Sequence, residues 1–289
     1  MTVHIPVLVE EVLAGLNPQV GDIIVDGTMG GGGHTRLLLS LVGKPGRVVG
    51  FDRDPQATED TNARLDDPRL TAIASNYADA PEQLQKLGIN SVNGVLLDLG
   101  LSSDQLADRE RGFSYQSAGP LDLRFNPLAG ESAAKLINRL SEKHLADLIY
   151  QYGEERLSRR IARKIVATRR SDRIETSEQL ARLVRSCVPR SKNHNIDPAT
   201  RTFQALRIAV NDELKWLKVA MARLPNLLVP GGRIAVISFH SLEDRIVKQA
   251  FVESNELRIL TKKPLTASES ELLNNSRSRS AKLRIAERR

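Results

Sequence analysis

The chain has 289 residues, of which 40% are hydrophobic and 27% charged, a composition typical of a globular protein, and its net charge of +7 is compatible with a polyanionic partner without indicating one. A single cysteine, Cys187, excludes an internal disulfide and a thiolate cluster, and five scattered histidines give no reason to expect a metal. The sequence shows neither a signal peptide nor an apolar run of the roughly 20 residues that span a bilayer, so we expect a cytoplasmic protein with no membrane partner.

Short apolar runs alternate with helical patterns through the first hundred residues. Strands are predicted at 23–26, 48–52, 70–74 and 94–98, and helices at 35–41, from Pro55 onward, and at 81–87. Three of these strands end in an aspartate, and Pro55 is of the type favoured in the first turn of a helix. The alternation is typical of βαβ units and predicts a parallel sheet of the doubly wound α/β class.

The pattern changes after about Ser103. Up to Arg201 the sequence shows only helical stretches, at 133–140, 144–152, 154–167 and 177–188, and the strand pattern returns at 233–239. We interpret the chain as an α/β domain made of residues 1–103 and 202–289, with residues 104–201 forming an inserted helical domain. A single mixed domain is the alternative.

A glycine-rich turn from Asp26 to His34 follows the first predicted strand. Such a turn binds nucleotide-like ligands at the carboxyl edge of a parallel sheet. A phosphate-binding loop would need a lysine, which the run lacks, and the dinucleotide pattern Gly-x-Gly-x-x-Gly fits it in no register. S-adenosyl-L-methionine carries no phosphate and needs no such cradle, so this methyl donor is the remaining candidate cofactor.

Acidic residues close the second and fourth predicted strands. Asp52 lies 19 residues after Gly33, where a carboxylate can accept hydrogen bonds from both ribose hydroxyls; the alternative is a helix cap, which Asp54 could also provide. Asp98 faces the same crevice, unless it only begins a loop. Tyr77 could stack beside the adenine or belong to the core.

With these residues the sequence resembles the ribosomal RNA small-subunit methyltransferase H family, also called MraW. The resemblance runs nearly from end to end and rests on nine segments. They are His4–Leu8, Val25–Thr28, Gly32–His34, Phe51–Pro55, Leu97–Ser103, Arg111–Ser114, Tyr152–Arg156, Pro198–Ala205 and Ile237–Arg245.

The resemblance implies a Rossmann-like class I methyltransferase sheet with an inserted all-helical domain. It implies methylation of the exocyclic N4 of a cytidine in the decoding region of small-subunit (16S) ribosomal RNA, with S-adenosyl-L-methionine as cofactor, in the cytoplasm. Residues implied to contact the cofactor are Gly32, Gly33, His34, Asp52, Tyr77 (usually Phe in the family), Asp98 and Gln105.

The chain departs from the family pattern at several positions. Asp104 replaces a usual proline, Ala118 a usual aspartate and Leu123 a usual methionine, and the Asn-Pro-Arg near the end reads Asn-Ser-Arg at 275–277. None of these removes a residue implied to hold the cofactor. They leave the contacts with the methyl acceptor less defined.

Methyl transfer is a direct displacement at the sulfonium, so the protein mainly has to orient donor and acceptor. The N4 lone pair of cytosine is delocalised, and an acceptor hydrogen-bonded to the amine would favour its attack. Asp98 is the candidate for this catalytic role. His240 should border the same crevice, either as an acceptor-side contact or as a structural hydrogen-bonding group. Ser241, with Asp244 three residues later, is typical of a helix N-cap.

Positive charge is concentrated in one segment. Between Arg156 and Arg190 the chain has eleven Arg or Lys and three Asp or Glu, a net charge of +8 that exceeds that of the whole chain. The spacing of Leu157, Ile161 and Ile165 predicts a buried helical stripe. The basic residues would then be a phosphate-binding surface or merely a solvated face. They include Arg159, Arg160, Arg163 and Lys164, and a second basic candidate is the tail with Arg277, Arg279, Lys282, Arg284, Arg288 and Arg289.

The expected partner is small-subunit ribosomal RNA or the assembled 30S particle, and the sequence leaves a homodimer open. Two other functions compete. One is a non-catalytic RNA-binding assembly factor with a vestigial cofactor pocket, against which the intact aspartates and glycine run argue. The other is methylation of DNA or protein by the same fold.

Overall fold

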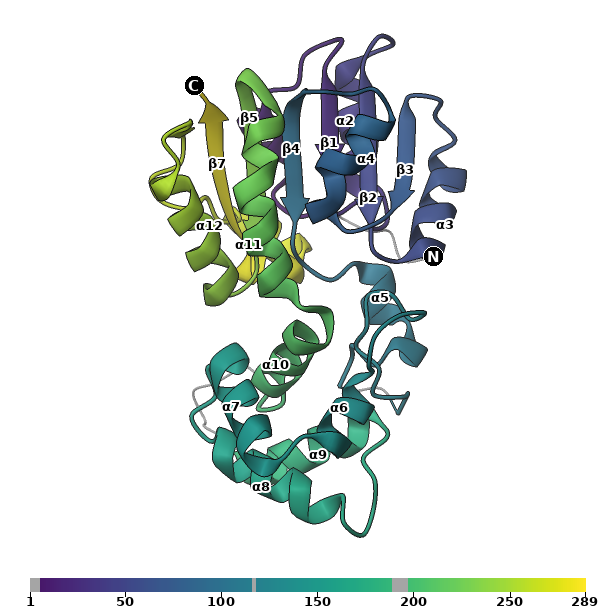
Figure 1. The fold of residues 1–289 in the computed structure, drawn as a ribbon, viewed down its shortest axis with the longest axis vertical. Helices are drawn as coiled ribbons and strands as arrows, with labels where there is room; N and C mark the ends of the chain where they lie inside the picture. Colours follow the sequence, from purple (N-terminus) through teal and green to yellow (C-terminus); the bar gives the residue numbers. More distant parts are fainter. Residues whose placement is uncertain (1–5, 116–117, 189–196) are drawn as a thin grey trace. The chain divides into compact units, whose positions relative to one another are not determined.

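A computed structural model describes residues 6–115, 118–188 and 197–289, and the chain forms two compact units (Figure 1). The first unit combines the chain up to Ser102 with the chain from Leu214 onward, and the second runs from Ser103 to Glu213. The second junction therefore lies later than the expected boundary at residue 201. The reason is that α10 (Thr200–Asn211) packs on α7 (Glu142–Gly153), inside the second unit.

A seven-stranded sheet forms the centre of the first unit, in the order β3-β2-β1-β4-β5-β7-β6. β1 to β5 run parallel to one another, whereas β7 is antiparallel to both β5 and β6. All five predicted strands are confirmed, and β5 begins earlier than expected. The strands are β1 (Ile23–Asp26), β2 (Arg47–Asp52), β3 (Leu70–Ala74), β4 (Val92–Asp98), β5 (Leu228–Ser238), β6 (Leu257–Ile259) and β7 (Lys282–Arg288).

Helices pack on both faces of this sheet because the side chains of each buried strand alternate between two apolar clusters. In β1, Val25 belongs to one cluster and Ile24 to the other. Figure 1 shows α4 and α11 in front of the sheet, where Leu84 and Leu217 join the cluster of Val25. The helices are α1 (Val9–Leu16), α2 (Gly33–Val42), α3 (Pro55–Leu65), α4 (Ala80–Lys86), α11 (Glu213–Arg223), α12 (Ser241–Glu253) and α13 (Glu269–Asn274), with 3-10 turns η1 (Tyr77–Asp79), η3 (Leu224–Leu227) and η4 (Ser276–Ser280).

The carboxyl-terminal segment is a structural strand, so its interpretation as a basic RNA-binding tail is wrong for Arg284 and Arg288 of β7. Arg284 is 7% exposed, and its Nε donates to Asp244 Oδ1 at 2.6 Å. The Arg288 guanidinium donates to backbone carbonyls, among them that of Asn226 at 2.8 Å. Both guanidinium groups are therefore engaged in contacts within the first unit.

The second unit is helical, as the sequence predicts. Its core includes Ile161 and Ile165 of α8 and Leu180 and Val184 of α9, all fully buried. Between Ser103 and Glu213, the described residues show one isolated β-bridge, from Pro120 to Thr176, and no strand. Besides α7 and α10, the helices are α5 (Ser103–Ala107), α6 (Ala133–Arg139), α8 (Ser158–Thr168) and α9 (Ser177–Cys187), with the 3-10 turn η2 (Arg109–Arg111).

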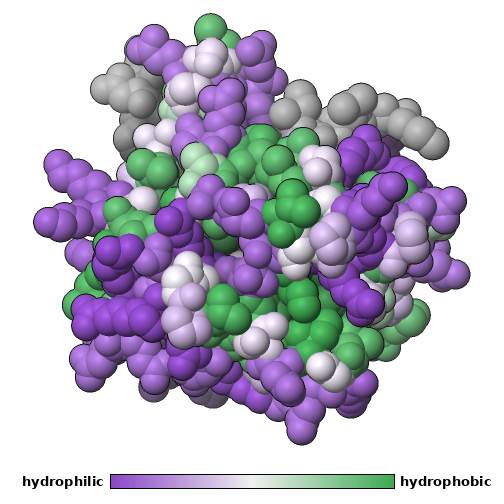
Figure 2. Space-filling view, turned by 90° about the horizontal axis from the view of Figure 1, so that it is seen from above, coloured by the Kyte–Doolittle hydropathy of each residue, from purple (hydrophilic) through white to green (hydrophobic). Residues whose placement is uncertain are grey.

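Hydrophilic residues make up much of the face drawn in Figure 2, with smaller hydrophobic patches between them. Within the described ranges, no helix combines the length and the apolar character that crossing a bilayer requires. His4 and Ile5 of the amino-terminal motif, and Arg190 of the basic segment, lie outside the described residues.

Ile285→Ala tests whether β7 is part of the core. Ile285 is 3% exposed, so removing its buried methyl groups should lower the free energy of unfolding by about 2–5 kcal/mol, measured by denaturant titration. Arg289→Ala, at the exposed end of the chain, is the matched control and should stay within about 0.5 kcal/mol of the wild type. Equal stability of the two variants would contradict the assignment.

Candidate active site

The first element of the site is the turn after β1, which begins at the buried carboxylate of Asp26. Asp26 is 1% exposed, and it accepts hydrogen bonds from Thr35 Oγ1 at 2.7 Å and from the Thr28 amide at 3.2 Å. Burial raises the pKa of Asp26, while His34 and the two hydrogen bonds work in the opposite direction. One carboxylate therefore joins the strand end, the turn and the first turn of α2.

Backbone hydrogen bonds fix the same turn to the strands on either side. The Gly27 amide donates to the Leu96 carbonyl in β4, and the Met29 amide donates to the Phe51 carbonyl in β2, both at 2.8 Å. Thr28 Oγ1 accepts from the Asp98 amide at 2.6 Å. Thr28 and Thr35 were absent from the predicted site residues, although both lie in or next to the glycine run.

Two glycines of the turn have identifiable steric reasons. A Cβ on Gly27 would lie 2.4 Å from Leu97 Cδ2, so only glycine lets the turn approach β4 this closely. Gly32 has φ +70° at the N-cap of α2, and a Cβ there would lie 2.8 Å from Thr61 in α3. Gly32 is thus required by the packing of α2 against α3, whatever contact its backbone makes with a ligand.

Asp52 ends β2 and is held by two backbone amides. Its Oδ2 accepts from Gly30 and its Oδ1 from Asp54, both at 2.9 Å. The N-cap of α3 is Asp54, which accepts from the amides of Gln56 and Ala57. The capping alternative for Asp52 is therefore excluded. Burial raises the pKa of Asp52, and the two amide hydrogen bonds oppose this rise.

His34 and Asp98 lie together at the carboxyl edge of the sheet. His34 Nδ1 is 3.8 Å from Asp98 Oδ2, and His34 Nε2 is 3.1 Å from the Val7 carbonyl oxygen. The two side chains are 6% and 16% exposed, respectively. Burial lowers the pKa of His34, whereas Asp26 and the Val7 carbonyl raise it. Tyr77 is half-buried and packs on the apolar cluster of Val25, beside Gly27.

The predicted residue Gln105 lies in α5 of the second unit, whereas Gly32, Gly33, His34, Asp52, Tyr77 and Asp98 all lie in the first. Within the first unit, the loop and the three aspartates come from β1, β2 and β4. These strands are adjacent and parallel, so their carboxyl ends meet at one edge.

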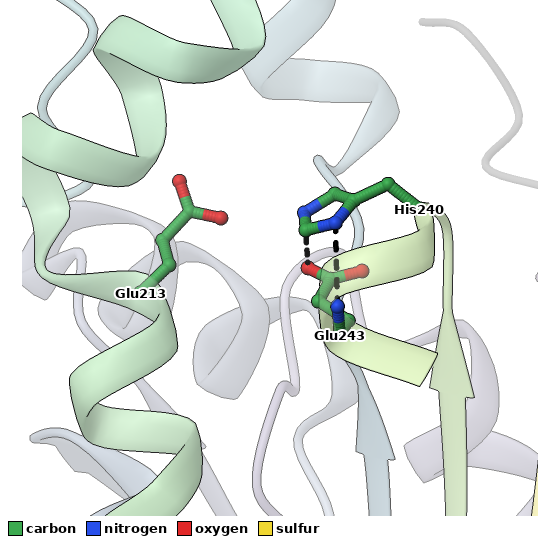
Figure 3. Close-up of side chains that lie close together, drawn as sticks. All are labelled: Glu213, His240 and Glu243. Carbon is green, nitrogen blue, oxygen red and sulfur yellow. Dashed lines mark hydrogen bonds and ion pairs between the residues drawn. The ribbon is translucent and has the colours of Figure 1, made fainter. Parts of the chain in front are cut away.

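His240 follows β5 and has the structural role that the sequence left open. Its Nδ1 accepts from the Glu243 amide at 3.4 Å, which makes His240, and not Ser241, the N-cap of α12. Figure 3 shows the ring beside the Glu243 carboxylate. The distance from His240 Nε2 to Glu243 Oε1 is 3.1 Å. The same carboxylate accepts from the Phe239 amide at 2.8 Å. Glu213, also drawn there, ends the second unit and pairs with Arg207 at 2.9 Å.

The polar groups at this edge of the sheet fit a nucleoside without phosphate. Gly30, at φ +45°, leaves open a position where a Cβ would lie 4.0 Å from Asp52 Oδ2 and 3.5 Å from Ser102 Cβ. The polar atoms next to this position are the Asp52 carboxylate and the Thr28 carbonyl oxygen, which are acceptors and suit ribose hydroxyls rather than a phosphate.

The sheet order, with an antiparallel β7 inserted between β5 and β6, and the glycine loop after β1 define a class I methyltransferase. The MraW methylase family matches residues 1–289. The chain belongs to this family. Its methyl donor is S-adenosyl-L-methionine, the cofactor of class I methyltransferases.

Three relatives are named Ribosomal RNA small subunit methyltransferase H. The protein of Deinococcus radiodurans is 52% identical over 286 residues, covering 99% of this chain and 89% of that protein. Those of Rhodopirellula baltica and Synechococcus elongatus are 48% and 50% identical, covering 99% of this chain and 92% and 94% of the relatives. A solved rRNA methylase of Streptococcus thermophilus has a TM-score of 0.45 at 12% identity, over 96% of this chain and 92% of that chain, a likeness too distant to add to the sheet order.

Proposed function

We propose that this methyltransferase transfers the methyl group of S-adenosyl-L-methionine to the exocyclic N4 of a cytidine in the decoding region of small-subunit ribosomal RNA. The names of relatives at about 50% identity support ribosomal RNA as the substrate. The observation that carries the proposal is the convergence of Asp26, Asp52 and Asp98 on one glycine-rich turn. The choice of N4 and of the decoding region rests on the family resemblance of the sequence.

In this proposal each group at the carboxyl edge of the sheet contacts a different part of the cofactor. The Asp52 carboxylate, already oriented by two amides, accepts hydrogen bonds from the ribose hydroxyls. The backbone of the glycine turn, including Gly32 and Gly33, lies against the nucleoside, and Tyr77 lies beside the adenine. His34 and Asp98 lie near the sulfonium, and the family resemblance assigns Gln105 to the cofactor as well.

The cofactor supplies an activated methyl group and a neutral thioether leaving group. The chain then has to orient the acceptor amine in line with the methyl–sulfur bond and to exclude water. Asp98 is our candidate catalytic residue, because its carboxylate ends β4 and its backbone is fixed to the turn by Thr28. A hydrogen bond from the N4 amine to this carboxylate would localise the nitrogen lone pair for attack, and the amine loses a proton in the reaction.

The second unit supplies the basic surface that the proposal assigns to RNA. Four basic residues of α8 are exposed: Arg159, Arg160, Arg163 and Lys164. Arg156, two residues before the helix, is exposed as well. Arg163 lies 3.6 Å from Glu142. In the part of the chain that the structure describes, Arg159, Arg160 and Lys164 have no acidic partner within salt-bridge distance. Three uncompensated cations on one short helix favour phosphate contacts over a merely solvated face.

Methyl transfer to isolated 30S subunits, followed by mass spectrometry of the digested RNA, tests the proposed function. Wild-type protein should add one methyl group to a single cytidine, at N4. Asp98→Ala should lower the rate by about 10²–10⁴-fold while the fold is retained, because the amine loses its acceptor. Asp60→Asn, an exposed change on α3, is the control and should leave the rate unchanged.

Two results would contradict parts of this account. A wild-type protein that binds 30S subunits without transferring a methyl group would favour the non-catalytic assembly factor. Near-normal turnover by Asp98→Ala would remove Asp98 from catalysis.

Charge reversal on α8 tests the RNA surface. The triple variant Arg159→Glu, Arg160→Glu, Lys164→Glu should weaken binding to small-subunit RNA by at least about tenfold at physiological salt, and should flatten its salt dependence, because fewer phosphates are neutralised. Affinity for S-adenosylmethionine should not change. The control reverses Arg36, Lys44 and Arg47, three exposed cations of the first unit. If both triple variants lose RNA affinity equally, net charge rather than this surface determines binding.

A further inference from the structure

We propose that His34 is a positioning residue whose protonation state balances the negative charge of Asp26 and Asp98 according to whether the bound cofactor carries a positive charge. While His34 is neutral, the negative charge of the carboxylates attracts the sulfonium donor, and protonated His34 replaces that cation. The inference rests on the proposed function, because it takes the sulfonium to lie beside Asp98.

The hydrogen bonds of His34 select one neutral tautomer. Nε2 lies 3.1 Å from the Val7 carbonyl oxygen, which can only accept, so Nε2 carries the hydrogen. In the neutral ring Nδ1 is then unprotonated, and it is the atom that faces Asp98 Oδ2 at 3.8 Å. A lone pair facing a carboxylate is an unfavourable arrangement unless a positive charge is shared between the two groups.

Two carboxylates, from two strands, affect the charge of this ring. Asp98 approaches from the end of β4, and Asp26, which is buried at the end of β1, interacts with the charge of the ring. Val7, near the amino terminus, contributes its carbonyl oxygen, and within the described residues no charged group other than Asp26 and Asp98 interacts with His34. When it is protonated, the ring is therefore a cation that faces Asp98 and that Asp26 stabilises.

Methyl transfer removes a positive charge from the position beside Asp98. The nitrogen–carbon bond forms, the carbon–sulfur bond breaks with its electron pair passing to sulfur, and the amine releases a proton. A sulfonium thus becomes a neutral thioether. A proton on His34 repels the sulfonium and not the thioether. Donor binding and His34 protonation therefore exclude each other, whereas the product can bind beside a protonated ring.

The direction of the pH dependence follows from this competition. As the pH falls through the pKa of His34, the donor has to displace a proton and its affinity decreases, while the affinity for the product changes little. Burial lowers the pKa of His34, which places the effect on the acid side of neutrality. At these pH values the cofactor's own α-amino group stays protonated, since such groups titrate at about 7.7–8.0.

Calorimetric titration of the full-length protein with S-adenosylmethionine and with S-adenosylhomocysteine, at several pH values from about 5.5 to 7.0, tests this inference. The ratio of the donor Kd to the product Kd should rise as the pH falls, by up to about tenfold for each unit by which the donor lowers the pKa of His34. NMR titration of the His34 ring should give a higher pKa in the product complex than in the donor complex.

Two variants separate titration from structure. His34→Gln retains an amide that can donate to Val7, and its Kd ratio should not depend on pH. His144→Gln, on α7 of the second unit, should retain the wild-type dependence. The inference is overturned if the wild-type ratio is constant, if His34→Gln titrates like the wild type, or if the His34 pKa is equal in the two complexes. If neither ligand binds the wild type at any pH, the proposed function itself fails, and this inference with it.

Discussion

The Asp26 carboxylate is the group on which the rest of the site depends. A carboxyl group that is 1% exposed is tolerated only when its oxygens are hydrogen-bonded, because burial removes its hydration. Here the Thr35 hydroxyl and the Thr28 amide provide those bonds, which requires the chain to turn sharply after β1 and to enter α2 at once. The shape of the glycine turn follows from the need to satisfy one buried acid.

That turn then positions the neighbouring acids. The Gly30 amide orients the Asp52 carboxylate, and the Thr28 hydroxyl accepts from the Asp98 amide at the end of β4. The Thr61 hydroxyl in α3 donates to the Gly30 carbonyl at 2.7 Å, so the other side of the turn is fixed as well. Contacts within the chain therefore fix the turn and the neighbouring strand ends, and such preorganisation lowers the ordering cost of binding.

Local sequence patterns predicted the parallel strands and most helices, because each has a clear periodicity and an identifiable start or end. Hydrogen bonding then decided what the patterns left open. Asp54 caps α3 and so frees Asp52, whereas His240 caps α12 although Ser241 is the commoner cap residue. A histidine ring reaches a backbone amide only in particular rotamers, and residue type alone does not reveal them.

The segment of β7 shows where sequence reasoning stopped. Leu283 and Ile285 alternate with charged residues, and the arginine at 284 makes the segment resemble a basic tail. Arg284 is buried because Asp244, 40 residues earlier in the chain, accepts its hydrogen bond. A partner so distant in sequence cannot be read from a local pattern. By contrast, the exposure of the basic face of α8 followed directly from the spacing of Ile161 and Ile165.

A crystal structure of the protein with S-adenosylhomocysteine tests the central claim most directly. The account predicts both ribose hydroxyls within about 3 Å of the Asp52 carboxylate, and the nucleoside against the turn from Asp26 to His34. A nucleoside bound elsewhere, or a ribose that does not contact Asp52, would contradict it.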